Sequence, residues 1–432
     1  MKFLLHSLNF APELTGIGKY TGEMVHWLVQ RGHDVRVVTA PPYYPEWQVP
    51  DGYSSTRYCK ERWEVDDGEA LVWRAPLWVP KKPSGAKRIV HLTSFAASSL
   101  PLMLAQWRWR ADIVFTVMPT LLCAPAALLT ARFMRAKSWL HIADFEVDAA
   151  FDMGILRFRG ARQAALAVER GLLRRFDRVS TISERMVERL AAKGVADTQR
   201  VFFPYWADIS GVYPLPHASP FRAELGLGDD HIVALYAGNL GEKQGLDILI
   251  NAAYLTRHDP RIVWVIAGAG EARSRLEEMA VGLRNMRWLP LQPVEKLNEL
   301  LNLADIHVLP QRADAADLVM PSKLNGMLAS GRPVVATAAP DTQVWKVVSE
   351  CGVCVPPGDV EAFGNQVVTL SRDPERRRAL GRRARRYAEA HLEFNAIMTR
   401  FEQEAMALIG ATVPIAEPSE EPQDRAVRGR SL

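Results

Sequence analysis

Near the middle of this 432-residue chain, a segment combines glycines with one lysine in an order suited to binding a phosphate group. Residues 232–236 are apolar and predict a buried strand, and residues 238–245 (GNLGEKQG) form a glycine-punctuated loop. An amphipathic helix is predicted to begin near Leu246. A strand, loop and helix start in this order presents free backbone N–H groups and the positive end of the helix dipole to an anion. Lys243 adds a full positive charge, so the segment favours a phosphate or diphosphate ligand.

A second lysine stands in an equivalent position in residues 319–336 (VMPSKLNGMLASGRPVVA). Ser322 is a plausible N-cap after Pro321, which places Lys323 in the first helical turn. A cation there opposes the helix dipole by about 0.3–1 kcal/mol. A diphosphate would reverse that sign, because one charge pair at about 4 Å and an effective dielectric near 20 is worth about 4 kcal/mol before desolvation. Lys243 and Lys323 therefore indicate an anion site.

Two further glycine loops are less specific. Gly268 and Gly270 follow an apolar segment at a predicted helix start, as in many α/β proteins. Gly16 and Gly18 belong to the segment TGIGKYTG, whose spacing is G-x-G-x-x-x-G, and the next predicted strand ends without an acidic residue. Both features argue against NAD binding. A close approach of the backbone to another ligand is the preferred interpretation, and a tight turn without a ligand remains the alternative.

The hydrophobic pattern predicts an α/β protein with two similar halves. In each half, apolar segments alternate with amphipathic helices, which is typical of parallel sheets covered on both faces. The predicted strands are residues 3–8, 34–39, 113–117, 138–142 and 179–182 in the first half, and 232–237, 261–267, 306–310, 333–336 and 353–355 in the second.

We therefore expect two doubly wound, Rossmann-like domains. The first covers residues 1–205 and the second residues 206–390, and the join falls in a stretch rich in proline and aromatic residues. A C-terminal helix, residues 391–410, is placed where it can pack back on the first domain. Residues 411–432 carry proline and charge without apolar periodicity and predict a disordered tail.

Composition excludes several classes of protein. The net charge is +4, with 48% hydrophobic and 24% charged residues, as in ordinary globular proteins. Basic residues interleave with acidic ones and no recognition motif is present, so we expect no nucleic-acid partner. Cys351 and Cys354 have C-x-x-C spacing but no second Cys/His pair nearby, so we favour buried cysteines and expect no metal. Residues 113–131 are uncharged over the length of a membrane span, yet their prolines favour a strand, a loop and a buried helix start.

These motifs together resemble those of the GT-B glycosyltransferases of family 4, which use nucleotide sugars bound between two Rossmann-like domains. The resemblance runs from about residue 3 to residue 409. Longer blocks resemble the colanic-acid biosynthesis (fucosyl)transferase group within that family, namely PELTGIGKYTGEM, VTAPPYYPEWQV, HIADFEVDA and GNLGEKQGL.

The resemblance assigns roles to individual residues. Lys243 and Lys323 would neutralise the donor diphosphate, and Asp144, near His141 and Glu146, would face the acceptor; these three residues (Lys243, Lys323 and Asp144) are the catalytic candidates. An N-terminal cap is an equally supported role for Asp144. The donor-binding candidates are Gly16, Gly18, Gly238, Asn239, Gly241, Gly268, Gly270, Asp317, Ser322 and Asn325.

The chain departs from the family pattern at two positions. Asn239 stands where many members carry an arginine that reaches the phosphates. Gly326 stands where most carry the second of two glutamates, and the first falls near Asp317. A ribose or sugar contact must then come from elsewhere, and Asn325 is the candidate.

The resemblance implies a cytoplasmic, retaining, metal-independent glycosyltransferase that needs no cofactor. Its expected donor is GDP-fucose, and its expected acceptor is a sugar on undecaprenyl diphosphate at the inner face of the bacterial inner membrane. Tryptophan and arginine mix at residues 107–110, and basic residues recur at 87–88 and 132–137, which suits a peripheral membrane protein. Two alternatives remain, a sugar-nucleotide epimerase or hydrolase of the same shape and a non-catalytic sugar-nucleotide-binding protein.

Overall fold

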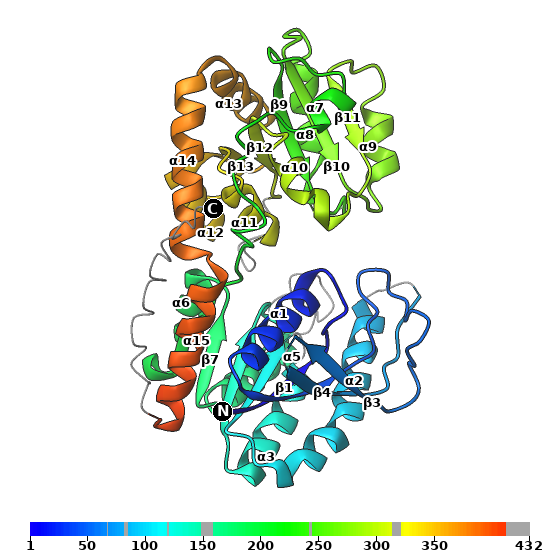
Figure 1. The fold of residues 1–432 in the computed structure, drawn as a ribbon, viewed down its shortest axis with the longest axis vertical. Helices are drawn as coiled ribbons and strands as arrows, with labels where there is room; N and C mark the ends of the chain where they lie inside the picture. Colours follow the sequence, from blue (N-terminus) through cyan, green and yellow to red (C-terminus); the bar gives the residue numbers. More distant parts are fainter. Residues whose placement is uncertain are drawn as a thin grey trace, which may run out of the picture.

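Two α/β domains, each built around its own sheet, make up the molecule (Figure 1). The structure is a computed structural model that describes residues 1–66, 68–81, 85–118, 121–147, 159–241, 244–312 and 321–411. Lys243, Asp317 and the predicted tail from residue 412 lie outside these ranges. The prediction of two doubly wound α/β domains is confirmed.

The sheet of the first domain has the strand order β3-β4-β2-β1-β5-β6-β7-β8. All neighbours are parallel except β3, which pairs antiparallel with β4. The strands are β1 (Lys2–Ser7), β2 (Asp34–Thr39), β3 (Cys59–Val65), β4 (Gly68–Arg74), β5 (Ile113–Met118), β6 (Lys137–Ile142), β7 (Arg178–Thr181) and β8 (Arg200–Phe202).

The expectation of a purely parallel sheet is therefore wrong at one edge. Strand β3 has the sequence CKERWEV, and of its seven residues only Val65 is buried. An edge strand with polar residues on both faces gives no apolar signal in the sequence, although it blunts the sheet edge against further pairing.

Helices cover both faces of this sheet and bury an apolar core on each. Helix α1 begins at Gly16, so both glycines of the first loop lie in its first turn. The helices are α1 (Gly16–Gln30), α2 (Gly85–Ala105), η1 (Gln106–Trp109), η2 (Leu121–Cys123), α3 (Ala124–Met134), α5 (Arg159–Leu173), α6 (Glu184–Ala192) and η3 (Asp197–Gln199).

The sheet of the second domain is parallel throughout, with the order β11-β10-β9-β12-β13-β14. Its strands are β9 (Ile232–Ala237), β10 (Ile262–Ala267), β11 (Met286–Leu289), β12 (Ile306–Leu309), β13 (Val334–Thr337) and β14 (Gly352–Val355). Its helices are α7 (Phe221–Glu224), α8 (Asp247–Leu255), α9 (Arg273–Met279), η5 (Val294–Lys296), α10 (Leu297–Leu301), α11 (Ser322–Ala329), α12 (Gln343–Cys351), α13 (Val360–Arg372) and α14 (Pro374–His391).

The chain crosses between the domains twice. Residues 203–206 lead from β8 to the second domain, and residues 392–393 lead from α14 back to α15 (Phe394–Ile409). Helix α15 lies along the first domain (Figure 1), where the Phe401 ring packs 5.3 Å from Phe115 and 4.9 Å from Trp139, between ring centroids. The core of the first domain is therefore completed by the last helix of the described chain.

One helical segment, residues 85–109, is long and apolar enough to cross a membrane by length and composition alone. Its buried side chains, among them Phe95 and Met103, pack into the first domain, and much of the rest of the segment is exposed. The uncharged residues 113–131 instead form β5, η2 and part of α3, with residues 119–120 outside the description.

Candidate functional site

The carboxyl edges of the two sheets face each other. Helix α6 follows the carboxyl end of β7, and α12 follows that of β13. The starts of these helices are joined across the domains by an ion pair between Glu184 and Lys346. Arg185 Nε also donates to the carbonyl oxygen of Asp341 at 2.7 Å. Since ligands of open parallel sheets bind beyond the carboxyl ends of the strands, the interdomain face is the expected site.

Two glycine loops of the second domain lie in direct contact at this edge. Gly238 ends β9 and Gly268 ends β10, and both have positive φ angles, +151° and +143°. A Cβ atom on Gly268 would stand 2.0 Å from the carbonyl oxygen of Gly238. The loops can pack this closely only because Gly268 has no side chain.

The same pairing continues along both loops. The backbone N–H of Leu240 donates to Ala269 O at 2.9 Å, and a Cβ atom on Gly270 would lie 2.4 Å from Leu240 O. Asn239 O accepts a hydrogen bond from the Tyr236 hydroxyl at 2.8 Å. Gly241 follows directly. The candidates Gly238, Asn239, Gly241, Gly268 and Gly270 therefore form one small, rigid surface of backbone.

Lys323 reaches this surface from the first turn of α11. Its Nζ donates to the hydroxyl oxygen of Tyr236 at 2.7 Å and to Gln244 Oε1 at 2.8 Å. It also lies 3.6 Å from the point where a Gly238 side chain would begin. Burial lowers the pKa of Lys323 to about 8. Its partners are neutral, and no carboxylate pairs with it among the described residues.

The Lys323 ammonium is thus partly buried, and the described part of the chain offers it no counter-ion. A pKa fall of this size corresponds to roughly 3 kcal/mol against the charged form. A bound diphosphate would supply the missing negative charge, and the neighbouring N–H groups would complete its hydrogen bonds. Lys323 is therefore the described side chain best suited to hold an anion.

Ser322 and Asn325, on the same helix, do not lie as the sequence suggested. The N-cap position is Pro321, and Ser322 is the first helical residue and makes no side-chain cap hydrogen bond, so its assignment as the cap is wrong. Asn325 is buried, and its Nδ2 donates to Tyr205 O at 3.1 Å and to Trp206 O at 3.4 Å. Its amide nitrogen thus ties α11 to the interdomain linker, whereas its buried Oδ1 has no hydrogen-bond partner in the described structure. A ribose contact by Asn325 remains a proposal.

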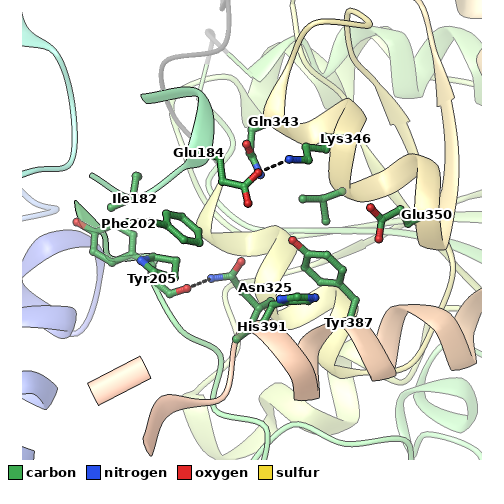
Figure 2. Close-up of a pocket in the computed structure, with 13 residues that line it drawn as sticks. Ile182, Glu184, Phe202, Tyr205, Asn325, Gln343, Lys346, Glu350, Tyr387 and His391 are labelled. Carbon is green, nitrogen blue, oxygen red and sulfur yellow. Dashed lines mark hydrogen bonds and ion pairs between the residues drawn. The ribbon is translucent and has the colours of Figure 1, made fainter. Parts of the chain in front are cut away.

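A small cavity of about 130 Å³ lies beside this linker, and Figure 2 shows the residues of both domains that line it. Asn325 points toward Tyr205, and the pair Glu184 and Lys346 lies across the opening. None of the loop glycines lines the cavity. It therefore belongs to the hinge between the domains, not to the glycine-loop surface.

Gly326, the position of the missing family glutamate, is partly buried and lies against α10. A Cβ atom there would lie 3.2 Å from Leu301 Cδ1. Any longer side chain would need Leu301 to move, so this helix has packed its glycine position against α10.

The local backbone and packing explain why glycine stands at positions 16 and 18 of the first domain. Gly16 has a φ of +59°, and a Cβ on Gly18 would lie 2.5 Å from both Cβ and Oε2 of Glu13. Glu13 is buried, and its carboxylate accepts hydrogen bonds from the backbone N–H groups of Tyr43 and Tyr44, both at 3.0 Å. Desolvation raises its pKa, opposed by these bonds. The tight-turn alternative thus accounts for both glycines, and a ligand contact there remains a proposal.

Asp144 follows the carboxyl end of β6, at the same edge of the first sheet. Burial raises the pKa of Asp144 to about 6 and that of Glu146 to about 7, and the charge of Arg88 opposes both shifts. Glu146 Oε2 accepts a hydrogen bond from the backbone N–H of Leu121 at 2.7 Å. Two carboxyl groups that titrate near neutral pH are suited to proton transfer.

His141 is part of the core. Its Nδ1 lies 2.9 Å from Ser180 Oγ, and complete burial lowers its pKa to about 3. The neighbouring strand, not a substrate, accounts for this residue.

The candidates therefore fall into two groups on facing sheet edges. The glycine loops and Lys323 gather on the second domain, and Gly16, Gly18 and Asp144 lie on the first. Within the ranges that the structure describes, no hydrogen bond or ion pair joins the two groups. Sequence reasoning missed Tyr236 and Gln244 as partners of Lys323.

Comparison with known proteins shows the family of this chain. Residues 15–206 match the glycosyl transferase 4-like domain, and residues 231–373 match the glycosyl transferases group 1 domain. A relative from Escherichia coli K12, described as the putative colanic acid biosynthesis glycosyl transferase WcaI, is 44% identical over 93% of this chain and 98% of its own length. The chain is a GT-B glycosyltransferase of family 4.

Solved structures show the same fold for this glycosyltransferase. The sucrose-phosphate synthase of Thermosynechococcus elongatus has a TM-score of 0.74 at 18% identity, covering 95% of this chain and 100% of its own. Anabaena HepE in complex with UDP and glucose has a TM-score of 0.66 at 15% identity, covering 94% and 100%.

We predict that donor binding by this glycosyltransferase weakens as the pH rises through about 8. The free enzyme loses the Lys323 proton near its lowered pKa, and a diphosphate raises that pKa, so binding above pH 8 must take up a proton. The affinity should then fall by up to about tenfold per pH unit. Calorimetry with GDP-fucose and UDP-glucose from about pH 7 to about pH 9 measures this, with Lys323→Met as the control. Equal slopes for the two proteins would contradict it.

Proposed function

We propose that this enzyme transfers a sugar, fucose from GDP-fucose as first candidate, to a lipid-linked oligosaccharide of an exopolysaccharide of the colanic-acid kind. The observation that carries the proposal is the Lys323 ammonium beside the paired glycine loops, which suits a diphosphate. The name of the 44%-identical relative supports the pathway, and the resemblance supports the donor.

The chemistry follows from where charge develops. As the bond between sugar and phosphate breaks, negative charge grows on the leaving diphosphate, and Lys323, Lys243 and the N-terminus of α11 stabilise it. An interaction that strengthens with this charge lowers the barrier more than it tightens ground-state binding. The acceptor hydroxyl attacks the same face of the sugar, which retains the anomeric configuration.

We assign acceptor activation to the carboxyl pair at the end of β6. Asp144, with its pKa near 6, is mostly ionised at neutral pH and can orient the acceptor hydroxyl or take its proton. Glu146 accepts a hydrogen bond from the Leu121 N–H, and burial and the charge of Asp144 raise its pKa, so we propose that it exchanges this proton with Asp144.

The first prediction concerns the donor. A thermal-shift screen with GDP-fucose, GDP-mannose, UDP-glucose and UDP-galactose should show strong stabilisation by GDP-fucose. At about 100 times the dissociation constant, the gain is about 2.7 kcal/mol, or roughly 5 °C or more for a domain of this size. Guanosine, which lacks the diphosphate, is the matched control and should shift the midpoint little. A larger shift with a uridine donor would contradict the choice of base.

The second prediction concerns catalysis by cationic side chains. Lys243→Ala should lower the rate of transfer by about 10²–10³, comparable to the loss of one preorganised donor at a developing negative charge.

We also propose that no metal takes part, so wild-type turnover should be unchanged in excess EDTA. Full turnover by a folded Lys243→Ala protein would remove Lys243 from the diphosphate site, and inactivation by EDTA, reversed by a divalent cation, would contradict metal independence.

A surface of the first domain suits a lipid-linked acceptor. Helices α2 and α3 pack side by side, and exposed apolar side chains on and next to them include Val90, Trp107, Leu129 and Phe133. Seven lysines and arginines and one acid, Asp112, occur in residues 85–137. Exposed apolar side chains among basic ones are typical of proteins that lie on anionic membranes. We therefore propose peripheral binding to the cytoplasmic face of the inner membrane through this surface.

The third prediction tests that surface by flotation with phosphatidylglycerol-containing vesicles at low salt. The wild-type protein should float, and the variant Leu129→Ser/Phe133→Ser should bind the vesicles at least about tenfold less tightly. Full burial of such a side chain is worth roughly 1.5–3 kcal/mol, and about half of each is exposed and available for burial. Leu255→Ser/Val281→Ser also replaces two exposed apolar side chains by serine, in the second domain, and serves as the control. Equal flotation by both variants, or none by the wild type, would argue for a soluble acceptor.

A further inference from the structure

A groove of about 740 Å³ lies on the second domain, at the amino edge of its sheet. Asp305 precedes β12, and Arg332 precedes β13, whereas the glycine loops follow the carboxyl ends of β9 and β10. The groove is therefore at the opposite edge from the donor site. It is lined by Arg332, Arg377, Arg378, Arg382, Arg385 and Arg386.

Glycine at position 381 allows the groove to form. A Cβ on Gly381 would lie 2.2 Å from the carbonyl oxygen of Gly331 and 3.6 Å from the Cα of Arg332. Helix α14, along one side of the second domain (Figure 1), thus lies directly against the turn that ends α11. This contact brings Arg332 opposite the arginines of α14.

Backbone carbonyls hold two of these arginines in place. Arg385 Nη1 donates to Val212 O at 2.7 Å and to Ala329 O at 2.8 Å. Arg377 Nη1 donates to Leu370 O at 2.5 Å and to Ser371 O at 2.8 Å. These two guanidinium groups are fixed in orientation before any ligand arrives.

Three other arginines form an exposed row. Arg378, Arg382 and Arg386 are spaced four residues apart on α14, where like charges oppose helix formation by about 0.2–0.5 kcal/mol per pair. Arg378 has Glu375 at 4.0 Å. Arg382 and Arg386 have no ion pair within the described part of the chain. Repulsion among these arginines destabilises the helix, and a bound anion would offset that repulsion.

Carboxylates neutralise the groove only in part: Glu389 accepts a hydrogen bond from Arg385 Nε at 2.7 Å. Asp305 is engaged by Arg222 Nη1 at 3.1 Å and by the backbone N–H of Val233 at 2.9 Å. The buried Nε of Arg332 lacks a hydrogen-bond partner in the described structure. Burial and the charge of Arg222 lower the pKa of Arg332. An anion in the groove would relieve both the repulsion and the unpaired donor.

We propose that this groove binds a soluble anion with two or more phosphate groups, of about the size of a nucleoside triphosphate. Guanidinium groups match phosphate oxygens in pairs, and the volume is in the range of ligand pockets, about 300–1,000 Å³. A membrane surface fits less well, because no large apolar side chain is exposed between residues 303 and 411 among those described. The site is separate from the donor site and does not depend on the proposed function.

The test is calorimetry of the full chain with inorganic tripolyphosphate. Arg378→Gln/Arg382→Gln/Arg386→Gln should weaken binding at least about tenfold, since each charge-assisted hydrogen bond is worth about 1.5–3 kcal/mol. Arg372→Gln/Arg376→Gln/Arg383→Gln removes the same charge from positions outside the groove and should bind within about twofold of wild type.

Two arms distinguish other sources of the same chemistry. Lys323→Met should keep tripolyphosphate binding. Loss of binding in that variant, with binding retained by the groove variant, would place the anion at the donor loops and overturn the proposal.

The two arginine variants should float equally with phosphatidylglycerol vesicles. Flotation lost only in the groove variant, without tripolyphosphate binding by the wild type, would make the groove a lipid site and overturn the soluble ligand. If both arginine variants weaken tripolyphosphate binding equally, binding reflects only the positive charge of the region, and the proposal is overturned.

Discussion

The proposed donor site depends on one partly buried ammonium group, that of Lys323, beside a surface of bare backbone. Lys323 is satisfied by a hydroxyl and an amide oxygen, and its lowered pKa records the missing opposite charge. Burying a positive charge without a counter-ion costs free energy, and a bound diphosphate would supply the opposite charge. The paired glycine loops serve the same end, because their bare backbones keep the surface beside Lys323 free of side chains.

The two crossings of the chain place this surface opposite the first domain. The linker after β8 carries the second domain at the carboxyl edge of the first sheet, and α15 returns to complete the first core. Asn325 connects the helix that carries Lys323 to that linker. The helix proposed to hold the anion is therefore tied to the linker between the domains, and the cavity in Figure 2 lies beside the same linker.

The sequence predicted the repeated α/β plan well, because buried parallel strands are apolar throughout. The predicted strands lie within about two residues of the observed ones. Strands β3, β4, β8 and β11 were not predicted, and β3 in particular is mostly polar and exposed. The N-cap of α11 was misplaced by one residue because Pro321 itself fills that position.

The site was harder to predict than the fold. Glycine and lysine spacing indicated the anion loops, but Tyr236 and Gln244 are 87 and 79 residues from Lys323 in the chain, and no local pattern links them. Likewise, nothing in the segment HIADFEVDA separates His141, which points into the core, from Asp144 and Glu146, whose pKa values depend on burial by distant elements. The sequence shows which ionisable groups are present, but the fold determines which of them are buried.

A crystal structure of the enzyme with an intact nucleotide sugar would test the central claim most directly. The account predicts that a diphosphate oxygen lies about 3 Å from the Nζ of Lys323, over the loops of Gly238 and Gly268. A diphosphate bound elsewhere, with Lys323 still joined only to Tyr236 and Gln244, would contradict it.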